Sequence, residues 1–143
     1  MSLITDKFFY DALRNNADVI EVTEGRIFNT ARPEIDEEED KIPYIIIQNM
    51  GTQEQNLTKD GDTTDNDTIT ILVVAETREE LGDITTLIRQ TIKEAMDELD
   101  YDDGEKLGYN MLDYTFSAGA VMYDFTKPCH YQELTWVCET ENL

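Results

Sequence analysis

Apolar residues near the start of the chain recur at spacings of three and four positions, which is the spacing of one face of an α-helix. Thr5 is suited to cap such a helix. Asn15 and Asn16 are suited to end it, because short polar side chains compete with helical hydrogen bonds. We predict a helix of about three turns, followed by two short segments, 19–22 and 25–28, that fit a bend and a small strand. The apolar face of the helix carries Ile4, Phe8, Phe9, Ala12 and Leu13.

Two strongly apolar segments, 43–47 and 68–75, predict strands. Both alternating faces of the first are apolar, so this strand is expected to be central or covered on both sides. The second has threonines and then Leu72 and Val74 on its other face, and something must cover those two side chains. A helix of the same chain and the sheet of a neighbouring subunit are equal alternatives for that cover. The regular apolar face of the second strand consists of Ile69, Ile71, Val73 and Ala75.

The stretch between these strands, residues 51–67, has almost no apolar side chain. A loop of this length in a compact domain is typical of a functional or disordered segment, so we expect a flexible, protruding hairpin tip. A second, acidic loop is expected at 34–40, where six of seven residues are carboxylates that cannot pack together in a core. Candidate contacts with a partner or a neighbouring subunit are Leu72 and Val74 on the strand and Gln53, Gln55, Leu57, Lys59 and Asp62 in the loop.

The strongest helix signal follows the second strand. Thr77 and Glu80 form a capping box, in which each side chain can satisfy a free backbone N–H at the helix start. The helix is predicted to run for about 22 residues, roughly 33 Å, and to lie with one apolar stripe on the sheet. Asp102, Asp103 and Gly104 then end it. The stripe consists of Leu81, Ile84, Ile88, Ile92, Ala95 and Leu99.

The last third of the chain alternates as strands do. One strand is predicted through Leu112 to Phe116 and another through Val121 to Phe125, joined as a hairpin at Ser117-Ala118-Gly119. Pro128 marks a further turn. The final strand places Leu134, Trp136 and Cys138 on one face, and we expect Trp136 to be a core anchor rather than a platform for a ligand.

These elements predict a single domain over residues 1–143, long enough to bury about two-thirds of its unfolded surface. The fold class is α/β of the α+β kind. It has two layers: a mostly antiparallel sheet of four to six strands, with one short N-terminal helix and one long helix packed on one face.

The charge of the chain limits its partners. With 32 acidic against 11 basic residues, the formal net charge is −21, which argues against binding nucleic acid through phosphate neutralisation. Two interpretations of the charge remain: solubility alone, or a surface that DNA passes without sticking. The only cysteines, Cys129 and Cys138, lie too far apart on one strand to bond to each other, so we expect reduced thiols. No basic leader or membrane span is evident, and we expect a cytosolic protein without membrane contact.

No residues in the sequence suggest catalysis, a metal or a cofactor. His130 is the only histidine, so a zinc site is not expected. The acidic residues at 60–67 miss the spacing of an EF-hand loop. There is no Gly-rich phosphate loop, nucleophile elbow or HExxH motif, and with so many carboxylates no pair stands out as a general acid and base. We therefore predict that the protein is not an enzyme.

Four features occur in an order that resembles the tail-completion proteins of long-tailed bacteriophages and prophages, the small tail-terminator family. They are Gly25-Arg26-Ile27-Phe28, the following Pro33, Pro43-Tyr44 at the start of an aliphatic strand, and 68–75 leading into Thr77 and the long helix. These features span roughly residues 5–100.

The resemblance implies a structural virion protein. Subunits would form a ring, typically hexameric, that caps the tail tube at its head-proximal end and joins tail to head, with assembly in the host cytoplasm before incorporation into the tail. Its partners would be further copies of itself and the tail-tube and head-connector proteins. In a ring, the next subunit would cover Leu72 and Val74, the loop at 51–67 would reach the tube or the connector, and the acidic balance would let DNA slide through the channel.

The acidic run at 34–40 and the extended strands from 108 to 140 depart from the family pattern. Three other hypotheses remain: a different neck or tail component, such as a head-tail joining or tail-tube protein; a non-phage acidic protein-interaction module; and, third, an enzyme. Position of the gene between head-connector and tail-tube genes would favour a phage role.

Overall fold

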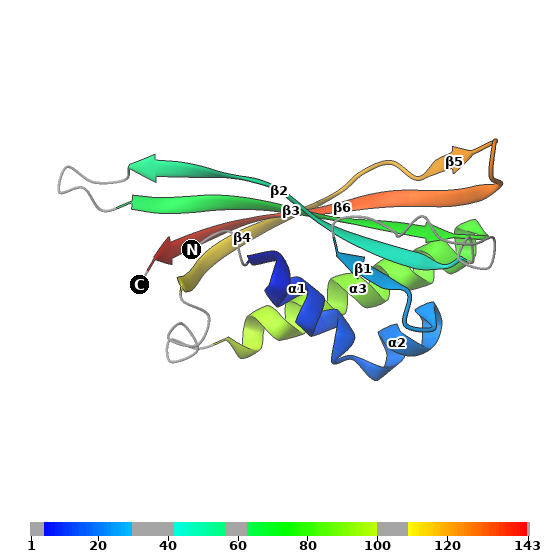
Figure 1. Cartoon of the computed structure of the whole chain (residues 1–143), viewed down its shortest axis with the longest axis horizontal. Coiled ribbons are helices and arrows are strands. Elements are labelled where there is room, and N and C mark those ends of the chain that lie inside the picture. Colours follow the sequence, from blue (N-terminus) through cyan, green and yellow to red (C-terminus); the bar gives the residue numbers. More distant parts are fainter. Residues whose placement is uncertain (1–4, 30–41, 57–62, 100–108, 143) are drawn as a thin grey trace.

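The computed structural model describes residues 5–29, 42–56, 63–99 and 109–142. They form two layers, a long sheet and a layer of helices on one side of it (Figure 1). Within these ranges, no helix combines the length and the apolar character that a membrane crossing requires. The elements are α1 (Thr5–Arg14), α2 (Ala17–Thr23), β1 (Ile27–Asn29), β2 (Tyr44–Asn56), β3 (Thr63–Ala75), α3 (Arg78–Glu98), β4 (Tyr109–Ala118), β5 (Met122–Asp124) and β6 (Cys129–Asn142).

The six strands are ordered β1-β2-β3-β6-β4, with β5 also paired to β6. Among the strand pairs of the described residues, β1 and β2 are parallel and the others are antiparallel. The predicted class, a two-layer α+β fold with a mostly antiparallel sheet, is confirmed. The apolar segment 43–47 was predicted to form a central strand because both of its faces are apolar. It lies at the start of β2, which is central because it pairs with β1 on one side and β3 on the other.

The core lies between the helices and the inner face of the sheet. Trp136 is 1% exposed, and its ring centroid lies 5.4 Å from that of Phe9 on α1 and 4.9 Å from that of Phe116 on β4. Trp136 is therefore the core anchor that the sequence predicted. Helix α3 contributes Leu81, Ile84, Ile88, Ile92 and Met96 to the same core.

The start of α3 confirms the predicted cap. Thr77 precedes the helix in an extended conformation, and its Oγ1 accepts a hydrogen bond from the backbone N–H of Glu80 at 3.1 Å. Glu80 in turn accepts from the backbone N–H of Glu76 at 3.2 Å. The first bond satisfies an N–H that the helix leaves without a helical partner. The second reaches Glu76, the residue before the cap, rather than the Thr77 N–H that a capping box would pair.

Helix α2 replaces the bend expected at 19–22. Asn16 ends α1, as predicted, but it also begins α2, because its side-chain oxygen accepts from the backbone N–H groups of Asp18 and Val19 at 3.0 and 3.1 Å. The helix ends at Glu24, which adopts the left-handed conformation with φ 52°. One asparagine thus serves as the stop of one helix and the N-cap of the next.

The predicted C-terminal hairpin is wrong. Strands β4 and β5 do not pair with each other; both pair with β6, β4 alongside residues 134–142 and β5 alongside 129–131. Gly119 keeps the chain beside β6 between them, because its N–H donates to the carbonyl of Glu133 at 2.8 Å and its carbonyl accepts from Gln132 Nε2 at 2.7 Å. Ser117 and Ala118 are therefore the last residues of β4, and from Gly119 the chain continues along β6 instead of turning.

The loop expected at 51–67 is largely strand. Residues 52–56 pair with 63–67, and residues 65–67 also pair with β6. Backbone pairing on both sides of β3 holds this polar stretch extended, which its low apolar content did not indicate. We call residues 51–56 and 63–67 the arm; it begins at a bulge where Gly51 has φ 120°. Residues 57–62 and the acidic loop at 34–40 lie outside the described residues.

Candidate assembly surfaces

The side of the sheet that faces away from the helices, called the outer face below, carries two apolar rows. Directly paired residues of neighbouring strands point to the same side, so each row is a continuous strip across several strands. One row ends on β3, and the other ends on β5. The rows consist of Phe28, Ile46 and Leu72, and of Tyr44, Val74, Tyr131 and Met122.

The two outer-face residues singled out from the sequence differ in burial. Val74 is 4% exposed within the single chain, where it lies between its register partners Tyr44 and Tyr131. Leu72 is only half-buried. Leu72 therefore keeps surface for a contact with a neighbour, whereas Val74 offers little. A subunit contact at Leu72 stays a prediction.

The structure places only part of the other predicted contact set. Gln53 is exposed on the arm. Gln55 is in β2, but its side chain is not among those described. The remaining three candidates lie outside the described residues: Leu57, Lys59 and Asp62.

The inner face of the arm holds a buried polar cluster. The side chain of Asp67 is fully buried, and its carboxylate accepts hydrogen bonds from Thr52 Oγ1 at 2.7 Å and Thr140 Oγ1 at 3.2 Å. Next to it, burial and then the Asp67 charge raise the pKa of Cys138 to about 12. The thiolate is the reactive form of cysteine, so this thiol is structural.

The second cysteine, Cys129, is also buried and free. Burial, followed by the nearby Asp124 charge, raises the pKa of its thiol as well. Across the described part of the chain, no three His, Cys, Asp or Glu side chains are placed to hold a metal ion. The two cysteines therefore contribute to packing in this structure.

The outer end of β5 exposes a group of apolar side chains that we call the tip: Val121, Met122, Tyr123 and Phe125. Phe125 is 86% exposed and Met122 is 48% exposed. Sequence reasoning placed these residues in a strand but missed their exposure. Three consecutive apolar residues, Val121 to Tyr123, were the available signal, because an alternating half-buried strand has a polar residue at every second position.

Helices α1 and α3 enclose a groove of about 680 Å³. Its floor is apolar, with Phe8, Ala12, Ala95 and Leu99, and three carboxylates line it: Asp11, Glu94 and Glu98. Asn16 Nδ2 donates to Thr91 Oγ1 at 3.3 Å and ties the two helices together at one end. Phe8 and Ala12 were predicted on the apolar face of the first helix, and Ala95 and Leu99 in the stripe of the long helix that packs on the sheet. The groove that these four side chains line was not predicted.

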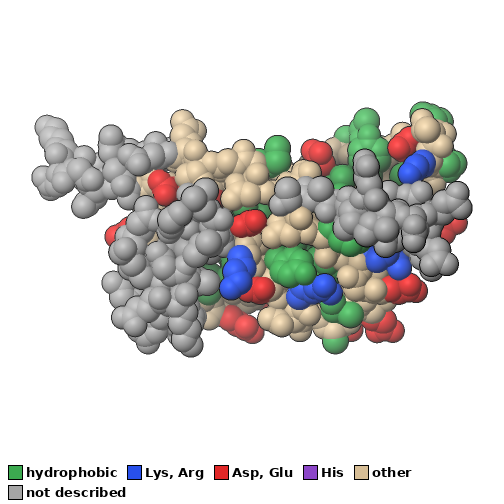
Figure 2. All heavy atoms as spheres, viewed as in Figure 1, with side chains coloured by type: hydrophobic (Ala, Val, Ile, Leu, Met, Phe, Trp, Pro, Cys, Tyr) green, Lys and Arg blue, Asp and Glu red, His purple; other side chains and the backbone are tan. Residues whose placement is uncertain are grey.

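Charge and apolar character are distributed unevenly on the surface. Figure 2 shows Asp and Glu side chains scattered over the visible face, while hydrophobic side chains gather at the end of the sheet where Figure 1 labels β5. Large exposed hydrophobic side chains of the described residues are Val22, Met50 and the tip. Within the described ranges, the tip is the one place where such residues adjoin one another.

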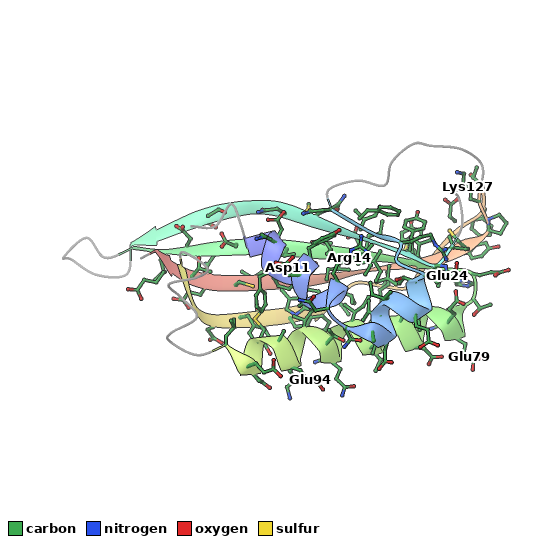
Figure 3. The ribbon with its side chains drawn as sticks, turned by 60° about the horizontal axis from the view of Figure 1, so that its bottom comes forward. Asp11, Arg14, Glu24, Glu79, Glu94 and Lys127 are labelled. Carbon is green, nitrogen blue, oxygen red and sulfur yellow. The ribbon has the colours of Figure 1, made fainter. Side chains whose placement is uncertain are left out.

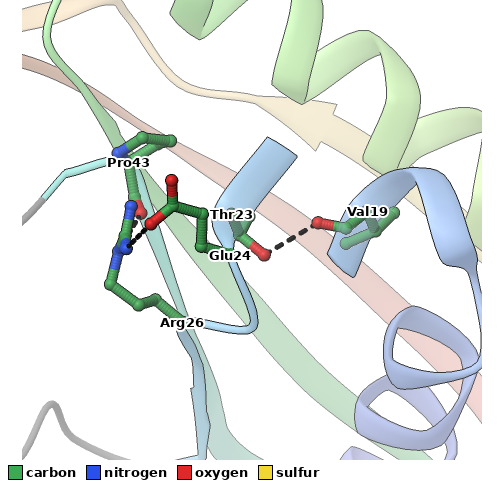
Figure 4. Close-up of polar contacts among 5 residues, drawn as sticks. All are labelled: Val19, Thr23, Glu24, Arg26 and Pro43. Carbon is green, nitrogen blue, oxygen red and sulfur yellow. Dashed lines mark hydrogen bonds and ion pairs between the residues drawn. The ribbon is translucent and has the colours of Figure 1, made fainter. Parts of the chain in front are cut away.

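Two motifs that carry the family resemblance meet in space (Figure 4). Arg26 Nε donates to the carbonyl of Pro43 at 2.9 Å, and Arg26 Nη1 lies 2.8 Å from Glu24 Oε2. Within α2, next to this contact between Arg26 and Pro43, Thr23 Oγ1 donates to the carbonyl of Val19 at 2.7 Å. The arginine thus ties the end of α2 to the start of β2 and sets β1 beside it.

Residues 9–110 match the sequence profile of the family described as tail completion protein gp17. The chain belongs to this family. The matched range contains the Arg26–Pro43 junction, α3 and the β2–β3 pair, whereas the tip and β6 lie beyond it. This member is therefore a tail-completion structural protein of the phage type.

A solved structure supports the fold of this tail-completion protein over its whole length. The similar chain comes from a structure titled "Virion of native gene transfer agent (GTA) particle", with a TM-score of 0.59 and 11% sequence identity. The match covers 96% of this chain and 95% of the other. Among curated proteins, none matches the sequence.

Proposed function

We propose that this tail-completion protein caps the tail tube at its head-proximal end and joins the tail to the head. The observation that carries the proposal is the family match over residues 9–110. The protein acts as a structural part of the virion, without catalysis. Its partners are further copies of itself, the tail-tube protein and the head connector.

The working form in this proposal is a ring, with six subunits as the expected number. Six copies have a mass of 6 × 16.5 kDa, about 99 kDa, and a formal charge of 6 × −21, about −126. A channel lined by like charge repels the DNA phosphates, so DNA passes without being held. Leu72 supplies contact area on the outer face, and Val74, which is buried on the same face, stabilises β3 at this position. The arm, with Gln53, reaches toward the tube or connector.

Deletion of the gene from the phage or prophage tests the position. Electron microscopy should then show filled heads separated from tails, together with tubes of irregular length. Expression of the protein in trans should restore joined particles, and gold label on a tagged copy should lie at the head-tail junction.

Two outcomes would contradict the proposed position. Label distributed along the tube would assign the protein to the tube wall. Intact, infectious particles after deletion would remove it from the virion assembly pathway. A neutral or basic channel lining in a reconstructed ring would overturn the DNA-passage part alone.

A further inference from the structure

The tip is held in place although its side chains are exposed. The rings of Tyr123 and Phe125 meet edge to face with centroids 4.8 Å apart, and Tyr123 also contacts His130 at 5.0 Å. The Asp124 carboxylate accepts from the backbone N–H groups of Thr126 and Lys127 at 2.9 and 3.4 Å, which orders the turn that follows. A fixed, exposed aromatic group loses little conformational entropy when it binds, which is typical of an interface anchor.

The groove between α1 and α3 has the opposite character. Its volume of about 680 Å³ falls within the range of about 300–1,000 Å³ that holds a drug-sized group, so it can accept an aromatic side chain together with a neighbour. Its floor is apolar, and among the residues that the structure describes no Lys or Arg lines it beside the carboxylates of Asp11, Glu94 and Glu98. An occupant must therefore combine apolar side chains with little negative charge.

We propose that the tip of one copy docks into the α1–α3 groove of a second copy, with Phe125 on the apolar floor. This inference rests on the proposed ring and names the contact that builds it. The occupant of the groove is thus a second copy of this chain.

Charge complementarity favours this occupant. The chain has 32 acidic residues, yet the stretch 114–132, which includes the tip, contains only Asp124 as an acid. Most other surfaces of a copy with net charge −21 would bring carboxylates against the carboxylates of the groove, at an electrostatic cost. The tip brings apolar rings together with the basic side chain of Lys127.

The positions of the two surfaces suit a head-to-tail contact. Figure 3 shows Lys127 at the β5 end of the sheet, whereas Asp11 and Glu94 lie on the helix layer away from that end. A tip therefore meets the groove of another molecule rather than its own. A contact between two different surfaces repeats from copy to copy and closes into a ring where the rotation allows it.

The test compares self-association of four purified proteins by sedimentation velocity. They are the wild type, Phe125→Ser at the tip, Ala95→Arg in the groove, and Val22→Ser as a matched control at another exposed apolar residue, which is 40% exposed. We expect the wild type and Val22→Ser to associate as concentration rises. The tip and groove variants should each raise the dissociation constant at least ~30-fold, as loss of an interface anchor does.

Mixing the two defective variants is the decisive step. Phe125→Ser retains an intact groove and Ala95→Arg retains an intact tip, so the mixture contains one good contact per pair. It should form dimers of 2 × 16.5 kDa, about 33 kDa, and nothing larger. Circular dichroism melts establish that both variants are folded, and Glu98→Lys, at an exposed helix position, replaces Ala95→Arg if that melt is lowered.

Three results would overturn the inference. The first is a mixture that stays monomeric while the wild type associates, because the contact then lies elsewhere or joins two identical surfaces. The second is an equal loss of association in Val22→Ser. The third is a wild type that remains monomeric at all concentrations, which would remove the tip–groove contact but leave the location of the protein in the tail to the gold-label experiment.

Discussion

Replacement of Val74 by alanine tests whether the apolar rows of the outer face belong to the core of the single chain. Val74 is 4% exposed between Tyr44 and Tyr131. The substitution removes two buried carbon atoms, worth about 1.6 kcal/mol at ~0.8 kcal/mol each. Because the two tyrosines cannot fully close the gap, the total loss in the free energy of unfolding should be about 2–3 kcal/mol.

Urea unfolding followed by far-UV circular dichroism measures this loss. With a slope of about 2 kcal/mol per molar urea, the unfolding midpoint should fall by roughly 1 M or slightly more. Leu72→Ala is the matched control, since Leu72 lies on the same face of β3 but is half-buried. Its cost should be about 1 kcal/mol, which corresponds to a shift of roughly 0.5 M.

The order of the two variants decides the outcome. If Val74→Ala is as stable as the wild type, or if Leu72→Ala is the more damaging change, the outer face is not packed by the chain itself and the assignment of Val74 to the core fails. The corresponding aspartates extend the comparison. Val74→Asp should prevent folding because it buries an unpaired charge, whereas Leu72→Asp should remain folded and lose assembly.

Two further predictions concern α3 and β6. Thr77→Ala should lower the free energy of unfolding by about 1 kcal/mol, because it removes the acceptor for the Glu80 N–H; Thr77→Ser should retain most of it, and equal urea midpoints for the two variants would contradict the capping role. The pKa of Cys138 is raised from 9.0 to about 12, so between these pH values the folded state keeps a thiol proton that the unfolded state loses. The contribution of this protonated thiol to the free energy of unfolding is therefore complete below pH 9 and declines as pH rises from 9 towards 12. The urea midpoint should fall between pH 8 and pH 10.5, and this fall should be smaller in Cys138→Ala than in the wild type. Equal falls in the two proteins would contradict a protonated buried thiol.

The sequence predicted the elements whose signals are local. The helix α3 has its cap directly before its 21 residues and its carboxylates and apolar side chains within them, so its position required no knowledge of the rest of the fold. The alternation of Ile69 to Ala75 likewise identified the inner face of β3 without its partners.

The errors fall where the structure depends on distant pairing. The arm is polar, and only its pairing with β2 and β6 makes residues 63–67 a strand. Strand β5 was assigned to the wrong neighbour, because Gly119 resembles a turn residue in the sequence while its actual partners, Glu133 and Gln132, follow it on β6. Asn16 was recognised as a helix stop, but its second role as an N-cap depended on the geometry of the next turn.

The candidate surfaces were predicted in part. Leu72 and Gln53 lie at accessible positions, and their role as contacts stays a prediction, whereas the tip and the α1–α3 groove were missed. Periodicity reports which residues can share a face, but it does not report whether another element covers that face. The exposure of Phe125 follows from β5 lying at the end of the sheet, which is a property of the topology.

The bulge at Gly51 has a consequence for how relatives of this protein can diverge. Side chains of a strand point alternately to the two faces of the sheet. The bulge shifts the pairing of β2 with β3 by one residue, between residues 44–49, which lie over the core, and the arm. The arm extends beyond this bulge, so residues gained or lost between Asn56 and Thr63 change the length of the hairpin without changing the strand pairing over the core. Members of the family can therefore differ in the length of this hairpin while the rest of the fold keeps its shape.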